Sequence, residues 1–351
     1  ILRRTLSSAV ARCRVDFANI VHLQEVLTMA TVAAGIGLME FPFKTMSAFW
    51  RWVDLCESGG IDSIWQTDRL VSSAPMLESM SVMAALAGAT KRIEFGMNVV
   101  SLGYREPLEV AKQCATIDAM SEGRLLPAFG IGSPLSPDWK AMGRDGAGRG
   151  KRTDESMEIM RRLWSGEHVD FDGEHFHYRD AHICPLPVQK KLPMWYGGNN
   201  PASIRRTARF ATGWLGGPEG PEEAAKVVTD IRAACLEAGT RIPDDHYGAS
   251  FFFRYGSVDE PIVAKHLAAA LVRRPKRDPH TTIVIGDTND IMQRIRAYVA
   301  GGVTKFVLRP IGTDDDDLMR QTRLMIESLL PEIAGLNTPQ AKAERAQAAS
   351  A

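Results

Sequence analysis

The stretch 102–133 constrains the fold of this chain more than any other, because it reads as one complete unit of a parallel sheet. A helix begins at Pro107, where the missing N–H of proline costs no helical hydrogen bond. Apolar residues recur at helical spacing until Gly123, and the run 125–131 is apolar enough for a strand buried on both faces. The last four residues, 130–133, read Gly-Ile-Gly-Ser, and such glycines let backbone approach a ligand closely.

The same alternation of strand and helix continues along the chain from residue 32. We expect strands at 32–38, 61–66, 93–100, 125–131, 194–197, 214–216, 249–255 and 305–308. Eight such units around one core predict an α/β fold, a single (β/α)₈ TIM barrel. A doubly wound open sheet is the less favoured alternative, because no G-x-G-x-x-G motif opens the first helix.

Insertions are expected after the fourth and seventh strands, because the alternation breaks there. Residues 134–150 read as a Gly-, Pro- and charge-rich loop, and 166–192 contain a hairpin with Asp172 and Gly173 at its turn. Residues 256–282 read as an indistinct helical region.

The expected domain organisation is a core at 31–335 with two flanking segments. Residues 1–30 are Arg-rich and poor in acids, which fits either a transit-like leader or, our preferred interpretation, an extension outside the working core. Residues 336–351 are Ala-rich and polar, and we expect a frayed helix or a disordered tail there.

The composition supports a large core and argues against some partners. Of 351 residues, 45% are hydrophobic and 24% charged, as in ordinary globular proteins. The formal net charge is zero and no apolar run approaches bilayer length, so we expect neither nucleic acid nor membrane as a partner. Five scattered cysteines without a C-x-x-C pair favour a reducing, cytoplasmic location.

One motif carries a family resemblance. Residues 105–125 read R-x-P-x-x-x-A-K-x-x-A-T-x-D-x-x-S-x-G-R-L, and G-x-G follows at 130–132. With the segments 60–68, 192–198 and 298–309, this pattern resembles the luciferase-like flavin-dependent oxidoreductases, a superfamily that also contains enzymes using the deazaflavin coenzyme F420. The resemblance runs from about residue 34 to 330 and implies a barrel of the bacterial luciferase type.

The active site of such a barrel lies at the carboxyl ends of its strands. Asp118, Ser121 and Arg124 precede the fourth strand and are therefore expected to be scaffold. The candidates at the opposite face are Glu40, Thr67, Asp68, Arg69, Asn98, Val99, Ser101, Gly130, Gly132, Ser133, Gly197, Gly198, Asn199, Asn200, Arg254 and Arg309.

The resemblance implies how a flavin or deazaflavin would bind. The cofactor's phosphate is expected at Gly197, Gly198, Asn199 and Asn200, a strand exit that runs into a helix N-terminus with Ser203, Arg205 and Arg206 in its first turns. Gly286 and the segment 309–312 are the rival phosphate site or a substrate-anion site. Gly130, Gly132 and Ser133 are expected to contact the cofactor, and Asn98 and Val99, with a cis peptide between them or an ordinary trans strand end, to back its ring.

Asp68 and Arg69 are the expected catalytic pair, and they depart from the family pattern. The F420 branch usually has Asp-His at this point, and arginine cannot act as a routine acid or base. Arg69 is expected either to point inward as an electrostatic clamp or to pair with Asp68 at the surface. The F420-dependent sugar-phosphate dehydrogenases carry a catalytic Glu near Leu135, so we do not expect that activity.

No metal is expected. His175, His177 and His182 could suggest a metal site, but no carboxylate motif completes it and the resembling family uses none.

The resemblance implies an oxidoreductase acting on a small organic substrate. The first hypothesis is a monooxygenase using reduced FMN and O₂. The alternatives are hydride transfer with coenzyme F420 and a flavin-binding protein without turnover. Because the chain shows no NAD(P)-binding motif, a separate flavin or F420 reductase would deliver the reduced cofactor. A homodimer is also expected.

Overall fold

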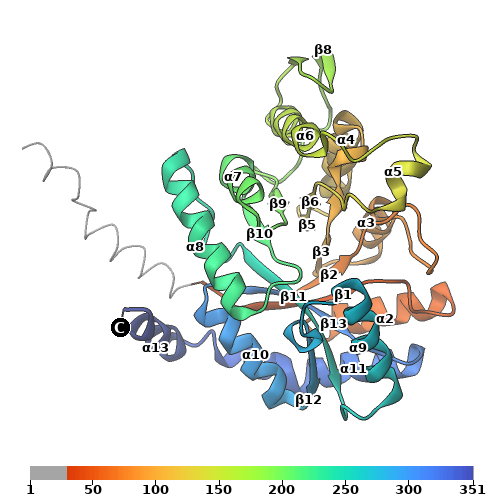
Figure 1. Cartoon of the computed structure of the whole chain (residues 1–351), viewed down its shortest axis with the longest axis vertical. Helices are drawn as coiled ribbons and strands as arrows, with labels where there is room; N and C mark the ends of the chain where they lie inside the picture. The colour runs from red at the N-terminus through yellow and green to blue at the C-terminus, as the bar shows by residue number, and fades with distance from the viewer. Residues whose placement is uncertain (1–29, 351) are drawn as a thin grey trace, which may run out of the picture.

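The computed structural model describes residues 30–350 and shows a closed, mainly parallel barrel (Figure 1). Its strands are β1 (Ala33–Leu38), β2 (Ser63–Gln66), β3 (Glu94–Met97) continued by β4 (Val100–Ser101), β5 (Leu125–Leu126) continued by β6 (Ala128–Gly130), β9 (Trp195–Tyr196), β10 (Gly213–Leu215), β11 (Tyr247–Tyr255) and β13 (Lys305–Pro310). The ring closes because β1 pairs with both β2 and β13, while β3 pairs with β5 and β4 with β6. The expected (β/α)₈ barrel is confirmed.

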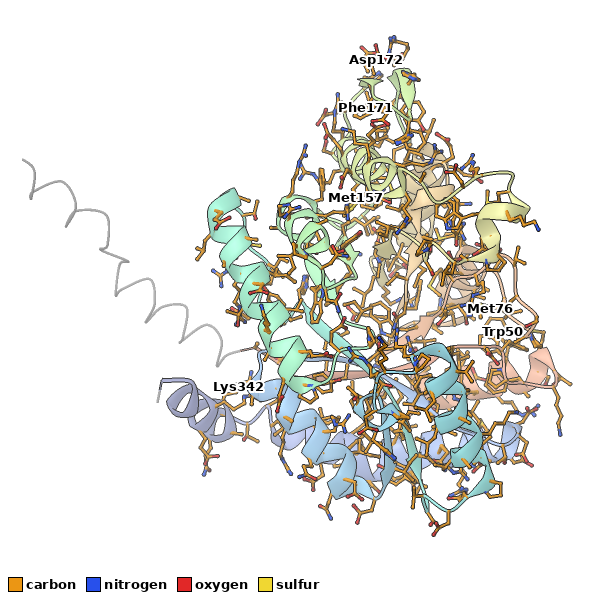
Figure 2. All side chains as sticks on the ribbon, in the orientation of Figure 1. Trp50, Met76, Met157, Phe171, Asp172 and Lys342 are labelled. Atoms are coloured by element: carbon orange, nitrogen blue, oxygen red, sulfur yellow. The ribbon has the colours of Figure 1, made fainter. Side chains whose placement is uncertain are left out.

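Helices surround this ring and alternate with its strands (Figure 1). They are α2 (Met46–Ser58), α3 (Ser79–Ala89), α4 (Pro107–Met120), α6 (Arg149–Trp164), α7 (Pro201–Phe210), α8 (Pro221–Ala238), α10 (Thr288–Ala300) and α11 (Asp315–Leu324). Helix α4 begins at Pro107 as expected. Helix α6 buries Met157 fully against the core (Figure 2).

Shorter elements complete the chain. They are η2 (Leu102–Tyr104), α5 (Pro137–Ala141), α9 (Pro261–Arg273), η3 (Pro279–Thr281), β12 (Ile283–Gly286), η4 (Met325–Leu329), α12 (Leu330–Gly335) and α13 (Pro339–Ser350). No helix in the range 30–350 combines the length and the apolar character needed to cross a membrane.

The insertion after the fourth barrel strand contains the expected hairpin. Strands β7 (Val169–Asp172) and β8 (His177–Ala181) pair antiparallel. The hairpin projects from one end of the molecule, with Asp172 at its tip (Figures 1 and 2). The loop expected at 134–150 also contains the short helix α5.

The structure contains one strand that was not expected, and it shows a helix where either a frayed helix or a disordered tail was expected. The insertion after β11 is more regular than expected, because β12 adds a strand that pairs parallel with β11 outside the ring. The tail is the helix α13, and Asn337 just before it exchanges two hydrogen bonds with the backbone of Val32. The expected extension at 1–30 lies, apart from Ala30, outside the described residues.

The interior of the barrel is filled, which places any ligand site above it. Trp65 and Trp195 meet edge to face with ring centroids 6.3 Å apart, in a cluster with Leu126, Ala128, Leu215 and Val307. Gly96 leaves space for this cluster, because a Cβ there would lie 2.7 Å from the Trp65 ring. Val99 packs against the same cluster.

The family motif ties the opposite, amino-terminal end together. The Asp118 carboxylate accepts hydrogen bonds from the backbone N–H groups of Val188 and Gln189. Arg124 donates to the carbonyls of Ala87 and Ile93. The scaffold role expected for these residues is confirmed.

Candidate functional site

A cavity of about 690 Å³ opens over the carboxyl ends of the barrel strands. Its wall includes most of the residues expected at the site, namely Arg69, Asn98, Val99, Gly130, Gly132, Ser133, Gly197, Gly198 and Asn199. Its size is within the usual range for small-molecule and cofactor sites. Four different strand exits, those of β2, β3, β6 and β9, therefore contribute these residues to one cavity.

The glycine exits bring backbone to the cavity surface. A Cβ on Gly130 would lie 2.9 Å from Val99 Cγ2. Gly198 has φ of 117°, and a Cβ there would lie 2.6 Å from Ser203 Oγ. Side chains larger than hydrogen would thus distort the wall at both positions.

The Asn98–Val99 peptide is cis, as expected from the resemblance. Beside this peptide, two polar side-chain atoms are buried in the wall of the cavity without a hydrogen-bond partner among residues 30–350. Neither Thr67 Oγ1 nor Asn98 Nδ2 has a hydrogen-bond partner within the described part of the chain. Buried polar groups are normally paired, so these two atoms mark a part of the wall where hydrogen-bond partners are missing.

Asp68 does not line the cavity. Its carboxylate is buried and accepts hydrogen bonds from Arg105 Nη2 at 2.6 Å, Ser79 Oγ at 2.8 Å and the Ser101 N–H at 3.3 Å. Burial raises the pKa of Asp68, and attraction by the Arg105 guanidinium opposes that rise. Asp68, expected to be catalytic, therefore connects the ends of β2 and β4 to the starts of α3 and α4 through these hydrogen bonds.

Arg69, unlike its neighbour Asp68, lies at the wall of the cavity. It is exposed, lines the cavity, and makes no hydrogen bond or ion pair with any described residue. The surface pair with Asp68, one of the two expected arrangements, is absent from the described residues, because Asp68 pairs with Arg105 instead.

Helix α7, which follows β9, does not itself line the cavity; only the loop before it does. Asn200 does not line the cavity but caps α7, accepting from the Ser203 N–H at 2.9 Å. Arg206 is buried against Asp154 and donates to the Tyr196 hydroxyl at 3.0 Å. Gly197, Gly198 and Asn199 are therefore the part of the expected phosphate site that faces the cavity.

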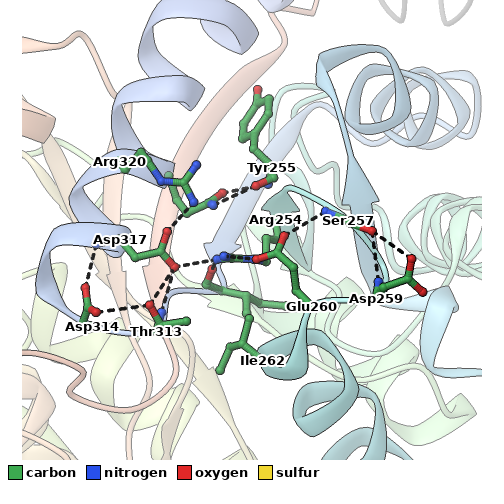
Figure 3. Close-up of polar contacts among 12 residues, drawn as sticks. Arg254, Tyr255, Ser257, Asp259, Glu260, Ile262, Thr313, Asp314, Asp317 and Arg320 are labelled. Carbon is green, nitrogen blue, oxygen red and sulfur yellow. Dashed lines mark hydrogen bonds and ion pairs between the residues drawn. The ribbon is translucent and has the colours of Figure 1, made fainter.

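Arg254, another candidate from the sequence, is an internal brace (Figure 3). Its guanidinium lies 2.5 Å from Glu260 and 2.7 Å from Asp317, and its side chain is 3% exposed. Burial would raise the pKa of Asp317, but hydrogen bonds from Arg254, Thr313 and Arg320 outweigh this effect and lower it to about 2.

The wall beside the sixth and seventh barrel strands, β10 and β11, contains residues that the sequence analysis missed. They are Glu219, Ser250, Phe252, His266, Arg273, Arg274 and Arg277. Positions 266, 270 and 273 recur at helical spacing, so one face of a helix ending near 273 could have been recognised from that pattern. A helical region was expected at 256–282, but its indistinct hydrophobic pattern did not indicate which side of the helix faces the cavity.

Two of these missed groups have shifted ionisation. Burial lowers the pKa of His266, and the neighbouring charges of Lys265 and Arg273 add to this effect. Its Nδ1–H donates to the Ile262 carbonyl at 3.0 Å. Burial raises the pKa of Glu219, whose carboxylate accepts from the Gly217 N–H at 2.7 Å.

The histidines of the hairpin group differently from the expected set. His168, Asp180 and His182 have ligand atoms within 4.8 Å of one another, and all three side chains are exposed. His175 and His177, two members of the set considered from the sequence, are not in this group.

Comparison with known proteins agrees with this architecture. A family model described as luciferase-like monooxygenase matches residues 25–275. An uncharacterised protein of Mycobacterium tuberculosis is 36% identical over 170 residues, which are 48% of this chain and 58% of that relative. The F420-dependent glucose-6-phosphate dehydrogenase of Microbacterium testaceum is 26% identical over 317 residues, covering 80% of this chain and 91% of that enzyme.

Solved structures share the fold at low identity. The monooxygenase RslO1 from Streptomyces bottropensis superposes with a TM-score of 0.73 at 21% identity, covering 86% of this chain and 99% of its own. The coenzyme F420-dependent tetrahydromethanopterin reductase from Methanopyrus kandleri gives 0.70 at 20% identity, covering 87% of this chain and 100% of its own. At these identities the likeness concerns the fold alone.

Proposed function

Because this chain belongs to the luciferase-like monooxygenase family, and because its relatives include oxidoreductases that depend on F420, we propose that it transfers hydride between coenzyme F420 and a small organic substrate. The cofactor would occupy the cavity of about 690 Å³ at the carboxyl ends of the strands. A separate reductase or dehydrogenase would regenerate the other redox form.

One observation carries the proposal that a ring cofactor binds here. Thr67 Oγ1 and Asn98 Nδ2 are buried, unpartnered polar atoms on residues of the cavity wall, and glycine exits stand beside them. A polar, hydrogen-bonding ring edge would satisfy both atoms once the side chains turn toward the cavity, because neither atom is accessible to solvent in the cofactor-free wall. The residues present therefore fit a flavin or deazaflavin.

The chain's own residues would divide the binding task by position. The N–H groups near Gly197, Gly198 and Asn199, which precede the N-terminus of α7, would bind the phosphate. Val99 would back the ring, and the charged Arg69 would stabilise negative charge at the ring edge. The bound cofactor would supply the hydride chemistry itself.

F420 is preferred because relatives that align over most of this chain carry F420 in their names. Four-fifths of the chain aligns with an F420-dependent glucose-6-phosphate dehydrogenase. Leu135, expected near the position of the catalytic Glu in those enzymes, is 90% exposed and does not line the cavity, so a different substrate is proposed. FMN-dependent monooxygenation is the second candidate, favoured by the description of the matching family model.

Cofactor titration tests the proposal. The purified full chain is titrated with F420 and with FMN, each oxidised and reduced, while the ring absorbance is followed. We expect F420 to bind at least about tenfold more tightly than FMN, a difference of about 1.4 kcal/mol. Binding of reduced FMN without binding of F420 would contradict the proposal and support monooxygenation instead.

A further inference from the structure

Three arginines at one end of the cavity have no carboxylate partner. Arg309 lies near the end of β13, and Arg273 and Arg274 lie at the end of α9. None of the three forms an ion pair with any residue in 30–350; Arg273 donates only to the Ala269 carbonyl and the Met39 sulfur. The Arg309 guanidinium packs over Phe252, 5.4 Å from the ring centroid.

The two most deeply buried arginines of the described residues are paired with carboxylates, whereas Arg309 is half-buried and Arg273 and Arg274 are exposed. Arg254 is held by Glu260 and Asp317, and Arg206 by Asp154. At the open end, by contrast, burial and the neighbouring guanidiniums of Arg273 and Arg274 lower the pKa of Arg309 to about 10. Like charges held together in this way favour an anionic ligand among them.

Among the described residues, the acids nearby form no ion pair with these arginines, although attraction by Glu219 partly opposes the effect of burial, which lowers the pKa of Arg274. Glu219 accepts from the Gly217 N–H, and Asp278 caps η3. Asp314 caps α11, and Glu40 is exposed at the rim. None of these four carboxylates forms an ion pair with the three arginines.

Arg273 and Arg309 stand between two cavities. Both line the large cavity and also a smaller one of about 360 Å³ over the ends of β1 and β13. The smaller cavity has apolar walls that include Leu38, Phe41 and Phe252. It is large enough for a small organic molecule.

The ring order separates this end from the proposed phosphate site. Asn199 follows β9, whereas Arg309 ends β13, and β10 and β11 lie between these strands in the sheet. An anion at the arginines would therefore be distinct from a cofactor phosphate beside α7.

We propose that Arg273, Arg274 and Arg309 form a subsite for the carboxylate or phosphate of the organic substrate, whose apolar body lies in the smaller cavity. This inference rests on the proposed function, because it assigns the large cavity to the cofactor. A planar guanidinium suits either anion, since it can donate two parallel hydrogen bonds.

Isothermal titration of the full chain with benzoate, inorganic phosphate and the neutral isostere benzamide tests the subsite without turnover. Benzoate or phosphate is expected to bind at least about tenfold more tightly than benzamide, and Arg309→Gln is expected to remove that preference. Arg209→Gln is the matched control, because Arg209 is exposed and paired with Glu158 outside both cavities. Equal binding of all three probes, or unchanged anion binding in Arg309→Gln, would overturn the proposal.

A second arm identifies the source of the anion. With saturating cofactor, benzoate should still bind, and the cofactor affinity of Arg309→Gln should stay within about threefold of wild type. Competition between benzoate and cofactor would show that the arginines hold a group of the cofactor, which overturns the substrate assignment. If Arg309→Gln does not fold, the Arg273→Gln/Arg274→Gln variant replaces it. The probes bind cofactor-free protein, so a failure of the proposed function would appear separately, as absence of F420 and FMN binding.

Discussion

The Asp68 carboxylate and the Arg105 guanidinium lie 2.6 Å apart in a buried ion pair outside the cavity. Asp68 also accepts from Ser79 at the start of α3 and from the Ser101 backbone at the end of β4. The pair therefore fixes the position of the wall that Thr67, Arg69 and Asn98 contribute to the cavity.

Replacing Asp68 should lower stability more than it changes cofactor binding. In Asp68→Ala the largely buried Arg105 guanidinium keeps only its longer, 3.4 Å contact with Glu78, so we expect the free energy of unfolding to fall by about 3 kcal/mol. Urea unfolding of the cofactor-free protein measures this change. Arg69→Gln, one residue away but exposed, should change stability by less than about 0.5 kcal/mol. A stable Asp68→Asn variant that binds cofactor normally and lacks turnover would instead identify Asp68 as catalytic.

Thr67→Val should separate stability from ligand binding. The Thr67 hydroxyl is buried without a partner, so its removal should leave the cofactor-free protein as stable as wild type or up to about 1 kcal/mol more stable. Loss of its hydrogen bond to the cofactor should raise the dissociation constant about five- to tenfold.

Thr153→Val is the matched control for that change. Thr153 also buries an unpartnered hydroxyl, but it lies in α6 and does not line the cavity. Its replacement should affect stability in the same direction and leave cofactor affinity unchanged. Equal effects of the two substitutions on affinity would remove Thr67 from the site.

The barrel could be predicted because its evidence is local. Each strand is a short apolar run, and each strand exit then follows from the rule that ligands bind at the carboxyl ends. This reasoning found Arg69, Asn98 and the glycine exits, which line the cavity. It missed β12, because that strand pairs only with β11 outside the ring and the barrel pattern does not require it.

The partners of charged side chains could not be predicted in the same way. Asp68 selects Arg105, 37 positions away in the sequence, over the adjacent Arg69. Neighbouring side chains of an extended segment point to opposite sides, which explains why Arg69 faces the cavity and Asp68 does not. The arginines of α9 reach the site through tertiary packing of a helix whose hydrophobic pattern is weak.

Arg69 should discriminate between the redox states of the cofactor. Its guanidinium lines the cavity without a protein partner, and a reduced ring carries more negative charge than an oxidised one. Arg69→Gln should therefore weaken binding of the reduced form about tenfold and of the oxidised form by less, as measured by anaerobic titration. Equal effects on both forms would place Arg69 away from the ring edge.

The Asp317 brace should make stability depend on pH in the acid range. Its pKa in the folded protein is about 2, whereas an unperturbed aspartate titrates near 3.9, so folding favours the charged form. The resulting stabilisation, on the order of 2 kcal/mol, is fully present above the unfolded pKa and is lost as the pH falls from about 4 toward 2.

Urea unfolding of wild type and Asp317→Asn between pH 7 and 3 measures this loss, because the difference between the two proteins should shrink below pH 4. Asp316→Asn is the matched control in the same helical turn, since Asp316 is exposed and has no ion pair within the described residues. A difference between wild type and Asp317→Asn that stays constant down to pH 3 would show that Arg254 does not depend on the Asp317 charge.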